Sequence, residues 1–157
     1  MRKVYGDVAI LKARPEDASA LAGRLRPEDC AEVLASGHRS VEGCLDFGIK
    51  NSVEAYTVFL RGVPVAAFGI SVPSLLGPEA HIWFLGCPEM ARIKKTFMKL
   101  TRVYIAHFHE SFPCLWNIVD SRYGASVKWL AWCGARFVGD VMLNGVVFSK
   151  FALVKGD

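Results

Sequence analysis

The sequence predicts one α/β domain built on a mixed β-sheet. Three observations lead to this fold class. Apolar runs and segments of strand-like alternation are interspersed with segments of helical periodicity. The 157 residues are the length of a single domain, and no linker, repeat or low-complexity stretch divides them. With 52% hydrophobic and 22% charged residues, the composition excludes a disordered chain and a small disulfide scaffold.

The N-terminal third predicts a strand followed by helices. Residues 8–12 are β-branched and apolar enough to form the first strand. Pro15 and Pro27 each precede two acidic residues, which is the pattern of a helix N-terminus. Gly37 suits the end of the second helix. A short third helix is expected at 41–49, where glycines interrupt an amphipathic pattern.

The middle of the chain predicts strands and then a long helix. Residues 55–60 and 65–71 flank a Gly-Val-Pro turn and form a hairpin. Residues 73–78 form a loop, and 80–85 form the next strand. Pro88 suits the first turn of a helix that runs to about Ser111, because apolar residues recur there at three- and four-residue steps.

The C-terminal part predicts a buried strand, a helix and a hairpin. Residues 114–119 are a continuous apolar run, typical of a parallel strand, and 126–133 form a helix. Asn144-Gly145 is the strongest hairpin signal in the chain. It joins the last two strands, at 136–142 and 146–154. The resulting order is β-α-α-β-β-β-α-β-α-β-β.

Cysteine usage and the N-terminal sequence indicate a soluble protein of a reducing compartment. The five cysteines form no C-x-x-C pair, and with the four histidines they give no zinc-type spacing, so no metal is expected. The first residues lack the apolar core of a signal peptide. No apolar run reaches the roughly 18 residues of a membrane span. The net charge of +4 is compatible with an acidic partner or nucleic acid but does not require one.

The order of elements resembles the GCN5-related N-acetyltransferase (GNAT) fold over nearly the whole chain. The strand and long helix at 80–111 look like that family's acyl-coenzyme A cradle, and 115–119 looks like its fifth strand. Residues 126–137 look like its fourth helix and the glycine turn into its sixth strand. The resemblance implies an acyl-coenzyme A site between the fourth and fifth strands.

The family's pyrophosphate loop, [Q/R]-x-x-G-x-[G/A], is degraded in this chain. Its glycines let backbone N–H groups approach the phosphates at a helix N-terminus. The matching window begins at Arg92, but Lys95 and Phe97 occupy the two small-residue positions and would crowd that approach. If acetyl-coenzyme A does bind, Arg92, Lys94 and Lys95 are the expected cofactor residues; otherwise no cofactor is expected.

The sequence offers no convincing catalytic residue. The family's catalytic acid is usually a tyrosine in the fourth helix, and Leu130 stands at that position. Tyr123 replaces it only if its loop folds over the site. Glu79 and His81 are candidate general bases, although a solvated loop acid and a partly buried strand histidine are the more ordinary interpretations of these two residues.

A closer resemblance is to the internal virion protein A family of T7-like tailed phages, over about residues 55 to 155. It rests on Trp83-Phe84, on the basic segment 92–100, on Leu115-Trp116-Asn117 and on residues 134–137. That family is similar to acetyltransferases in fold and is associated with virion assembly. The resemblance implies a protein of the host cytoplasm or the virion, with other virion proteins as partners and no membrane contact.

Basic residues form one stripe along the long helix. They recur at steps of three and four: Arg92, Lys95, Lys99 and Arg102. No acidic residue lies between Glu89 and Glu110 to neutralise them. The stripe is either a solvated face or a contact for phosphate, nucleic acid or an acidic protein surface.

Two tryptophans and the basic stripe are the candidate interaction residues. Trp129 and Trp132 lie three apart on a helix, and we expect one of them in the core and the other at an interface. Lys99 and Arg102 are the expected charged contacts of that interface. The sequence thus favours a non-catalytic virion or assembly protein on a GNAT-like scaffold. It leaves open an acetyl-coenzyme A-dependent N-acetyltransferase and, third, a nucleic-acid-binding module.

Overall fold

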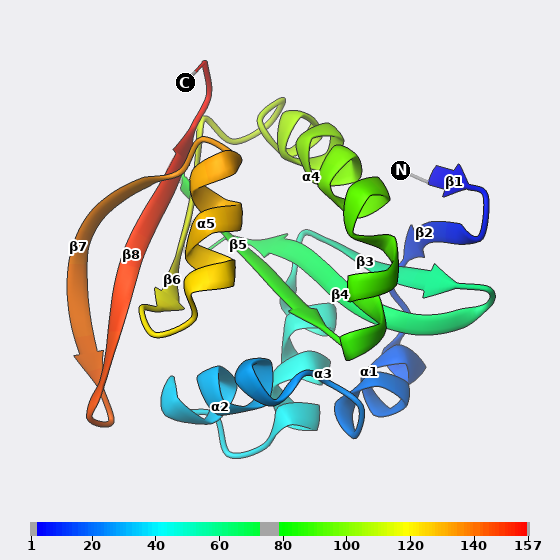
Figure 1. Cartoon of the computed structure of the whole chain (residues 1–157), viewed down its shortest axis with the longest axis horizontal. Helices are drawn as coiled ribbons and strands as arrows, with labels where there is room; N and C mark the ends of the chain where they lie inside the picture. Colours follow the sequence, from blue (N-terminus) through cyan, green and yellow to red (C-terminus); the bar gives the residue numbers. More distant parts are fainter. Residues whose placement is uncertain (1–2, 73–78, 157) are drawn as a thin grey trace.

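The computed structural model describes residues 3–72 and 79–156, and an eight-stranded sheet runs through the molecule (Figure 1). The strands are β1 (Lys3–Tyr5), β2 (Val8–Lys12), β3 (Glu54–Leu60), β4 (Val63–Ser71), β5 (Glu79–Gly86), β6 (Cys114–Asp120), β7 (Arg136–Leu143) and β8 (Val146–Val154). The helices are α1 (Pro15–Ala22), α2 (Pro27–Ala35), α3 (Val41–Asn51), the 3-10 helix η1 (Pro88–Ile93), α4 (Lys94–Phe108) and α5 (Gly124–Trp132). The predicted mixed α/β class is confirmed.

The sheet has the order β1-β2-β3-β4-β5-β6-β8-β7. Every neighbouring pair is antiparallel except β5 and β6, which are parallel. In the described part of the chain these two strands pair between Glu79–His81 and Cys114–Trp116 alone. Beyond that register they diverge, and in Figure 1 their ends lie well apart.

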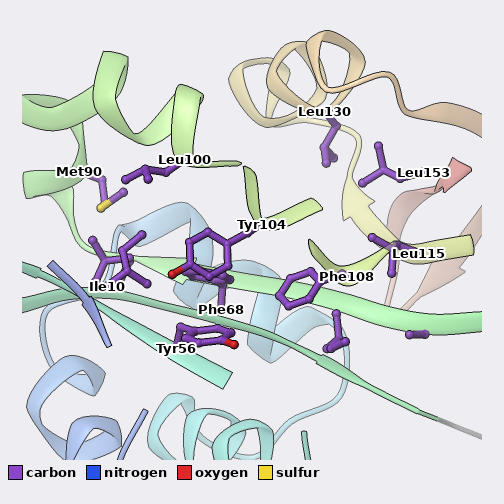
Figure 2. Packing of buried hydrophobic residues seen from close by; sticks show 14 of the residues in the cluster. Ile10, Tyr56, Phe68, Met90, Leu100, Tyr104, Phe108, Leu115, Leu130 and Leu153 are labelled. Atoms are coloured by element: carbon purple, nitrogen blue, oxygen red, sulfur yellow. The ribbon is translucent and has the colours of Figure 1, made fainter. Parts of the chain in front are cut away.

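Two apolar clusters hold the helices against the sheet. In the larger one, α4 and α5 pack on one face. Figure 2 shows Tyr104 and Phe108 of α4 lying over Tyr56 and Phe68, and the ring centroids of Tyr104 and Phe68 are 5.0 Å apart. The smaller cluster, around the fully buried Leu21, packs α1 and α3 on the opposite face.

Within the described residues the structure adds the strand β1 and the helix α3 to the order written from the sequence, and it divides the long helix into η1 and α4. Residues 3–5 pair with β2 as the short edge strand β1, which the sequence did not indicate. The helix expected at 41–49 spans Val41–Asn51 in the structure. Ser40 caps its first turn by accepting the Gly43 N–H over 3.0 Å, which stabilises the N-terminus of this helix. The loop predicted at 73–78 lies outside the described residues.

The long helix predicted from Pro88 begins instead as a 3-10 helix and becomes α-helical only at Lys94. A 3-10 helix has three residues per turn, so Met90 and Ile93 lie on the same side, and both pack against the larger core cluster. Ile93, at φ −119° and ψ 25°, interrupts the helical backbone between the two parts. Apolar spacing of three residues fits either helix type, which is why the periodicity predicted one continuous helix.

Candidate binding cleft

Asn117 occupies the point at which β5 and β6 separate. It follows Trp116, the last residue of β6 in register with β5. Its Nδ2 donates to the Ile82 carbonyl over 2.8 Å, and its Oδ1 accepts the Ile118 N–H over 2.8 Å. The side chain therefore takes the place of a backbone ladder bond where the strands part, and it fixes the start of the opening.

A cavity of about 1230 Å³ extends along this opening. Among the described residues, its walls come from β4 to β8 and from all the helices except α1. Ligand clefts typically measure about 300–1,000 Å³, so the volume is ample for a sizeable ligand. The wall formed by α4 and α5 is mainly apolar, whereas polar and titratable side chains lie toward α2 and α3: Arg26, Asp29, Glu32, His38 and Cys44.

Three aromatic rings meet on the apolar side of the cavity. Phe84 comes from β5, Phe97 from the first turns of α4, and Trp129 from α5. Their ring centroids are 5.0 Å (Phe84–Phe97), 5.7 Å (Phe97–Trp129) and 5.8 Å (Phe84–Trp129) apart. These are direct packing distances for aromatic pairs. We call this group the aromatic cluster, and no ligand chain can pass between its rings as they stand.

The segment that the sequence predicted to hold a pyrophosphate spans the end of η1 and the first turn of α4, and the two helices join at Ile93. Of the three predicted cofactor residues, Lys94 lines the cavity, while Arg92 and Lys95 are exposed and lie outside its wall. The backbone that would have to approach a phosphate is helical and carries bulky side chains, so this end does not fit the group.

Of the three candidate acid–base residues, His81 alone lines the cavity. Its ring packs edge-on against Trp116, with centroids 4.0 Å apart, and its Nε2 is buried with no hydrogen-bond partner among the described residues. Burial lowers its pKa below the ordinary 6.5, so the ring is neutral at pH 7. Glu79 is exposed, and Tyr123 precedes α5 beneath the Arg122 guanidinium, 5.7 Å from its ring centroid.

Glu32 of α2 is a titratable residue of the cavity that the sequence did not single out. Burial raises its pKa from the ordinary 4.5 to about 7. A hydrogen bond from the Asp120 backbone opposes this rise, and the nearby charge of Asp29 adds to it. The carboxyl therefore changes its charge near neutral pH.

The two acids beside Glu32 each have an arginine, whereas Glu32 has none. Asp29 pairs with Arg26 at 2.9 Å, and Asp120 pairs with Arg122 at 2.7 Å. In the described parts of the chain Glu32 forms no ion pair. An unpaired carboxyl with a strongly raised pKa in a cavity is typical of a functional site. Its sequence neighbourhood is that of any acidic helix, so only burial could reveal it.

The basic stripe is shorter than predicted, because Arg92 belongs to η1 and not to α4. Three cations share an exposed face of α4: Lys95, Lys99 and Arg102. The Arg102 guanidinium carbon lies 3.7 Å from the ring centroid of Trp132, which is 40% exposed. Trp129 lies in the aromatic cluster instead, so of these two tryptophans Trp132 is the more accessible.

Comparison with known proteins shows which fold this arrangement has. No family model matches the sequence, and no curated protein matches it. Solved structures match over nearly all of the chain. The ribosomal-protein-S5-alanine acetyltransferase from Vibrio fischeri has a TM-score of 0.70 at 13% identity, with 100% of this chain and 98% of that chain covered. The fold is that of the GNAT acetyltransferases.

Two further solved structures with coverage above 95% are complexes with coenzyme A. Spermidine N-acetyltransferase from Vibrio cholerae, in complex with coenzyme A and spermine, has a TM-score of 0.72 at 10% identity over 96% of this chain and 97% of its own. The ribosomal L7/L12 alpha-N-protein acetyltransferase, in complex with coenzyme A, has a TM-score of 0.68 at 11% identity over 97% and 96%. At these identities the likeness shows the GNAT fold alone.

In residues 3–72 and 79–156 no three His, Cys, Asp or Glu side chains gather as metal ligands do. None of the helices there is both long enough and apolar enough to cross a membrane.

Proposed function

We propose that this chain is a non-catalytic binding protein on a GNAT scaffold and that it acts in virion assembly. The observation that carries this proposal is the aromatic cluster, whose rings close the space between β5, α4 and α5 on the apolar side of the cavity. The bulky Lys95 and Phe97 at the two small-residue positions of the phosphate loop and the presence of Leu130 at the usual tyrosine position support it. The virion context rests on the sequence resemblance of residues 55 to 155.

The proposed contact surface is the exposed face of α4 together with Trp132. In the described part of the chain, no carboxylate lies within 4.0 Å of Lys95 or Lys99. These cations can therefore meet an acidic surface on another virion protein. Trp132, stacked on Arg102, adds the half-exposed aromatic group that is enriched at interface hot spots. The proposed location is the host cytoplasm and the assembled particle.

Calorimetric titration with acetyl-coenzyme A tests the non-catalytic proposal. We expect no binding tighter than about 100 μM, which corresponds to about 5.5 kcal/mol. Tighter binding by the wild type that Lys94→Glu weakens and the matched surface change Lys155→Glu leaves intact would overturn it. Phe97→Ala removes one ring of the aromatic cluster and so separates two causes of weak binding. If the cluster blocks the cleft, this change should restore binding of acetyl-coenzyme A. If the cleft lacks phosphate contacts, binding should remain absent.

The nature of the partner at the basic face is tested by salt-dependent binding. We expect fluorescently labelled polyglutamate to bind at low salt and Lys99→Glu to weaken that binding. Duplex DNA tests the nucleic-acid alternative. Tight DNA binding whose affinity falls steeply with salt would favour a nucleic-acid-binding module over a protein partner.

A second candidate function, N-acetylation of an amine, is favoured by Glu32 and by the cavity volume. A carboxyl with a pKa of about 7 can accept a proton from an ammonium group at neutral pH. The buried Nε1 of Trp129, which has no partner among the described residues, could also donate to a ligand. Turnover of acetyl-coenzyme A with a polyamine or an N-terminal peptide, lost in Glu32→Gln, would establish this function in place of the first.

A further inference from the structure

Helix α2 forms a wall at the polar end of the cavity. Its residues Asp29, Glu32 and Val33 are part of the lining. In Figure 1 the helix lies at the lower edge of the molecule, and its C-terminal end points toward the turn between β7 and β8. The two halves of α2 are attached to the rest of the protein in different ways.

The N-terminal half of α2 is fixed to the end of β5. The Gly86 N–H donates to Asp29 Oδ2 over 2.8 Å, and the Arg26 N–H donates to the Gly86 carbonyl over 2.9 Å. Asp29 is only 6% exposed and pairs with Arg26 at 2.9 Å. Cys30 packs against the smaller apolar cluster. This half is therefore held by buried bonds and by apolar packing.

Hydrogen bonds to distant elements hold the C-terminal half of α2. The Asp120 N–H, at the end of β6, donates to the Glu32 carboxyl. Asn144 Nδ2, in the turn between β7 and β8, donates to the Ala35 carbonyl over 2.8 Å. Val33 is 4% exposed, but it belongs to neither of the two apolar clusters. This half therefore depends on polar bonds, one of which has a titratable acceptor.

The connection that follows α2 permits this half to move. Residues 37–40, which lead into α3, are all exposed. They begin with Gly37 at φ +104°, a backbone angle that residues with side chains rarely adopt. Short exposed connections are the places that absorb the dihedral changes of a hinge motion. The helix can thus turn about its N-terminal attachment.

We propose that α2 is a lid on the cavity, closed while the Glu32 carboxyl holds its proton and swung away from β6 and from the β7–β8 turn once that proton is lost. The closed state places the carboxylate beside the charges of Asp29 and Asp120, out of contact with most of the water. In the open state water solvates it, while the bond of Asp29 to Gly86 remains as the hinge. The lid controls entry to the cavity under either function proposed above, so it does not rest on the choice between them.

The charges near Glu32 do not remove the cost of its ionisation in the closed state. α2 brings three charged residues to this end of the cavity: Arg26, Glu28 and Asp29. Arg26 lowers the pKa of Glu32 but is bound to Asp29 at 2.9 Å. Burial raises the pKa of Asp29 as well, although Arg26 and a backbone N–H favour its charged form. β6 brings Asp120, which binds Arg122 at 2.7 Å.

The remaining elements around the polar end contribute little charge. α3 brings Cys44, and burial raises the pKa of this thiol to about 11, so it is neutral at pH 8. The β7–β8 turn brings the uncharged Asn144. His38 after α2 and Lys128 of α5 line the cavity but are exposed, so water and salt screen them. Glu32 is thus the group that couples the lid to pH.

The strength of the coupling follows from two pKa values of Glu32, about 7 in the closed state and the ordinary 4.5 in the open state. The closed state binds the proton more tightly, so the stability that it gains is complete below pH 4.5 and is lost as the pH rises through about 7. The ratio of open to closed chains should therefore rise about tenfold between pH 6 and pH 8.

Hydrogen exchange of the Asp120 amide, followed by NMR at pH 6 and pH 8, tests the lid. Its protection factor should fall about tenfold over this range, whereas that of the Gly86 amide at the hinge should not. Ionisation without movement would instead strengthen the bond to Asp120, since a carboxylate is the better acceptor. Glu32→Gln should abolish the fall, and the control Glu28→Gln should keep it. Equal protection at the two pH values, or a fall that persists in Glu32→Gln, overturns the proposal.

Alkylation of Cys44 by iodoacetamide, located by mass spectrometry, measures access to the cavity itself. The wild-type rate relative to the Glu32→Gln rate should rise about tenfold from pH 6 to pH 8, because ionisation of the thiol cancels in this ratio. A constant or falling ratio would mean that the carboxyl titrates while the lid stays closed, which overturns the proposal. Asn144→Gly, which removes the bond to Ala35, should raise the rate at both pH values by the same factor; an unchanged rate would contradict this attachment. No ligand is present in either experiment, so both are independent of acetyl-coenzyme A binding.

Discussion

Replacing Glu32 with glutamine is expected to stabilise the folded protein at pH 8. Burial raises the pKa of this carboxyl from 4.5 to about 7, among the charges of Arg26, Asp29 and Asp120. A raised pKa means that the folded state binds the proton more tightly than the unfolded state does. The stability that this proton provides is complete below pH 4.5 and is lost as the pH rises through about 7.

The expected gain in unfolding free energy follows from the difference between these two pKa values. A change in pKa from 4.5 to about 7 corresponds to about 3 kcal/mol of unfolding free energy. Glutamine has the same shape, carries no charge to desolvate, and keeps an oxygen that can accept the Asp120 N–H. We therefore expect Glu32→Gln to gain about 1–3 kcal/mol at pH 8, and close to nothing at pH 4.5, where glutamate is largely protonated.

Urea unfolding followed by tryptophan fluorescence at pH 4.5 and pH 8 measures both quantities. Glu28→Gln is the control, because Glu28 lies one helical turn away with its side chain 40% exposed, at 3.8 Å from Arg26. It should produce no gain at pH 8. Unchanged or reduced stability of Glu32→Gln at pH 8, or an equal gain at both pH values, would refute the assignment of a buried, destabilised carboxyl.

Two further substitutions and one chemical modification test the packing and the cleft. Phe108→Ala, at a ring only 1% exposed, should lower the unfolding free energy by about 3–5 kcal/mol in urea; a loss under 1 kcal/mol would contradict its place in the core. Asn117→Ala removes both hydrogen bonds where β5 and β6 part and should cost about 1–3 kcal/mol in the same assay, whereas an unchanged midpoint would mean that the amide does not hold the strands. Burial raises the pKa of Cys44 to about 11, so iodoacetamide at pH 8 should modify it slowly when folded and rapidly in urea; fast modification of the folded chain would rule out this burial.

The fold could be predicted because its signals are local. The hairpin at Asn144-Gly145 needs positive φ at both residues, and the structure has 50° and 77° there. The apolar run at 114–119 forms the strand that pairs in parallel with β5, as such runs do. Local signals were insufficient for β1, whose three residues are too few to show a pattern, and for η1, whose apolar spacing also fits an α-helix.

The cleft could be predicted only in part, because its chemistry depends on contacts between distant segments. The sequence identified Phe97 as too large for a phosphate loop, but nothing local indicated that Phe84 and Trp129 would meet its ring. The bond from Asn117 to Ile82 spans 35 positions and depends on the register of two strands. The raised pKa of Glu32 depends on burial, which no motif encodes.

The role of the aromatic cluster is the central claim, and the indole signals of an ¹⁵N-labelled sample test it most directly. The Trp129 indole N–H belongs to that cluster, and comparison with Trp129→Phe assigns its signal. On addition of acetyl-coenzyme A to 1 mM, we expect this signal to stay unshifted. A saturable shift of the Trp129 signal, with half-saturation below about 100 μM, would contradict it and show that the cleft admits the cofactor.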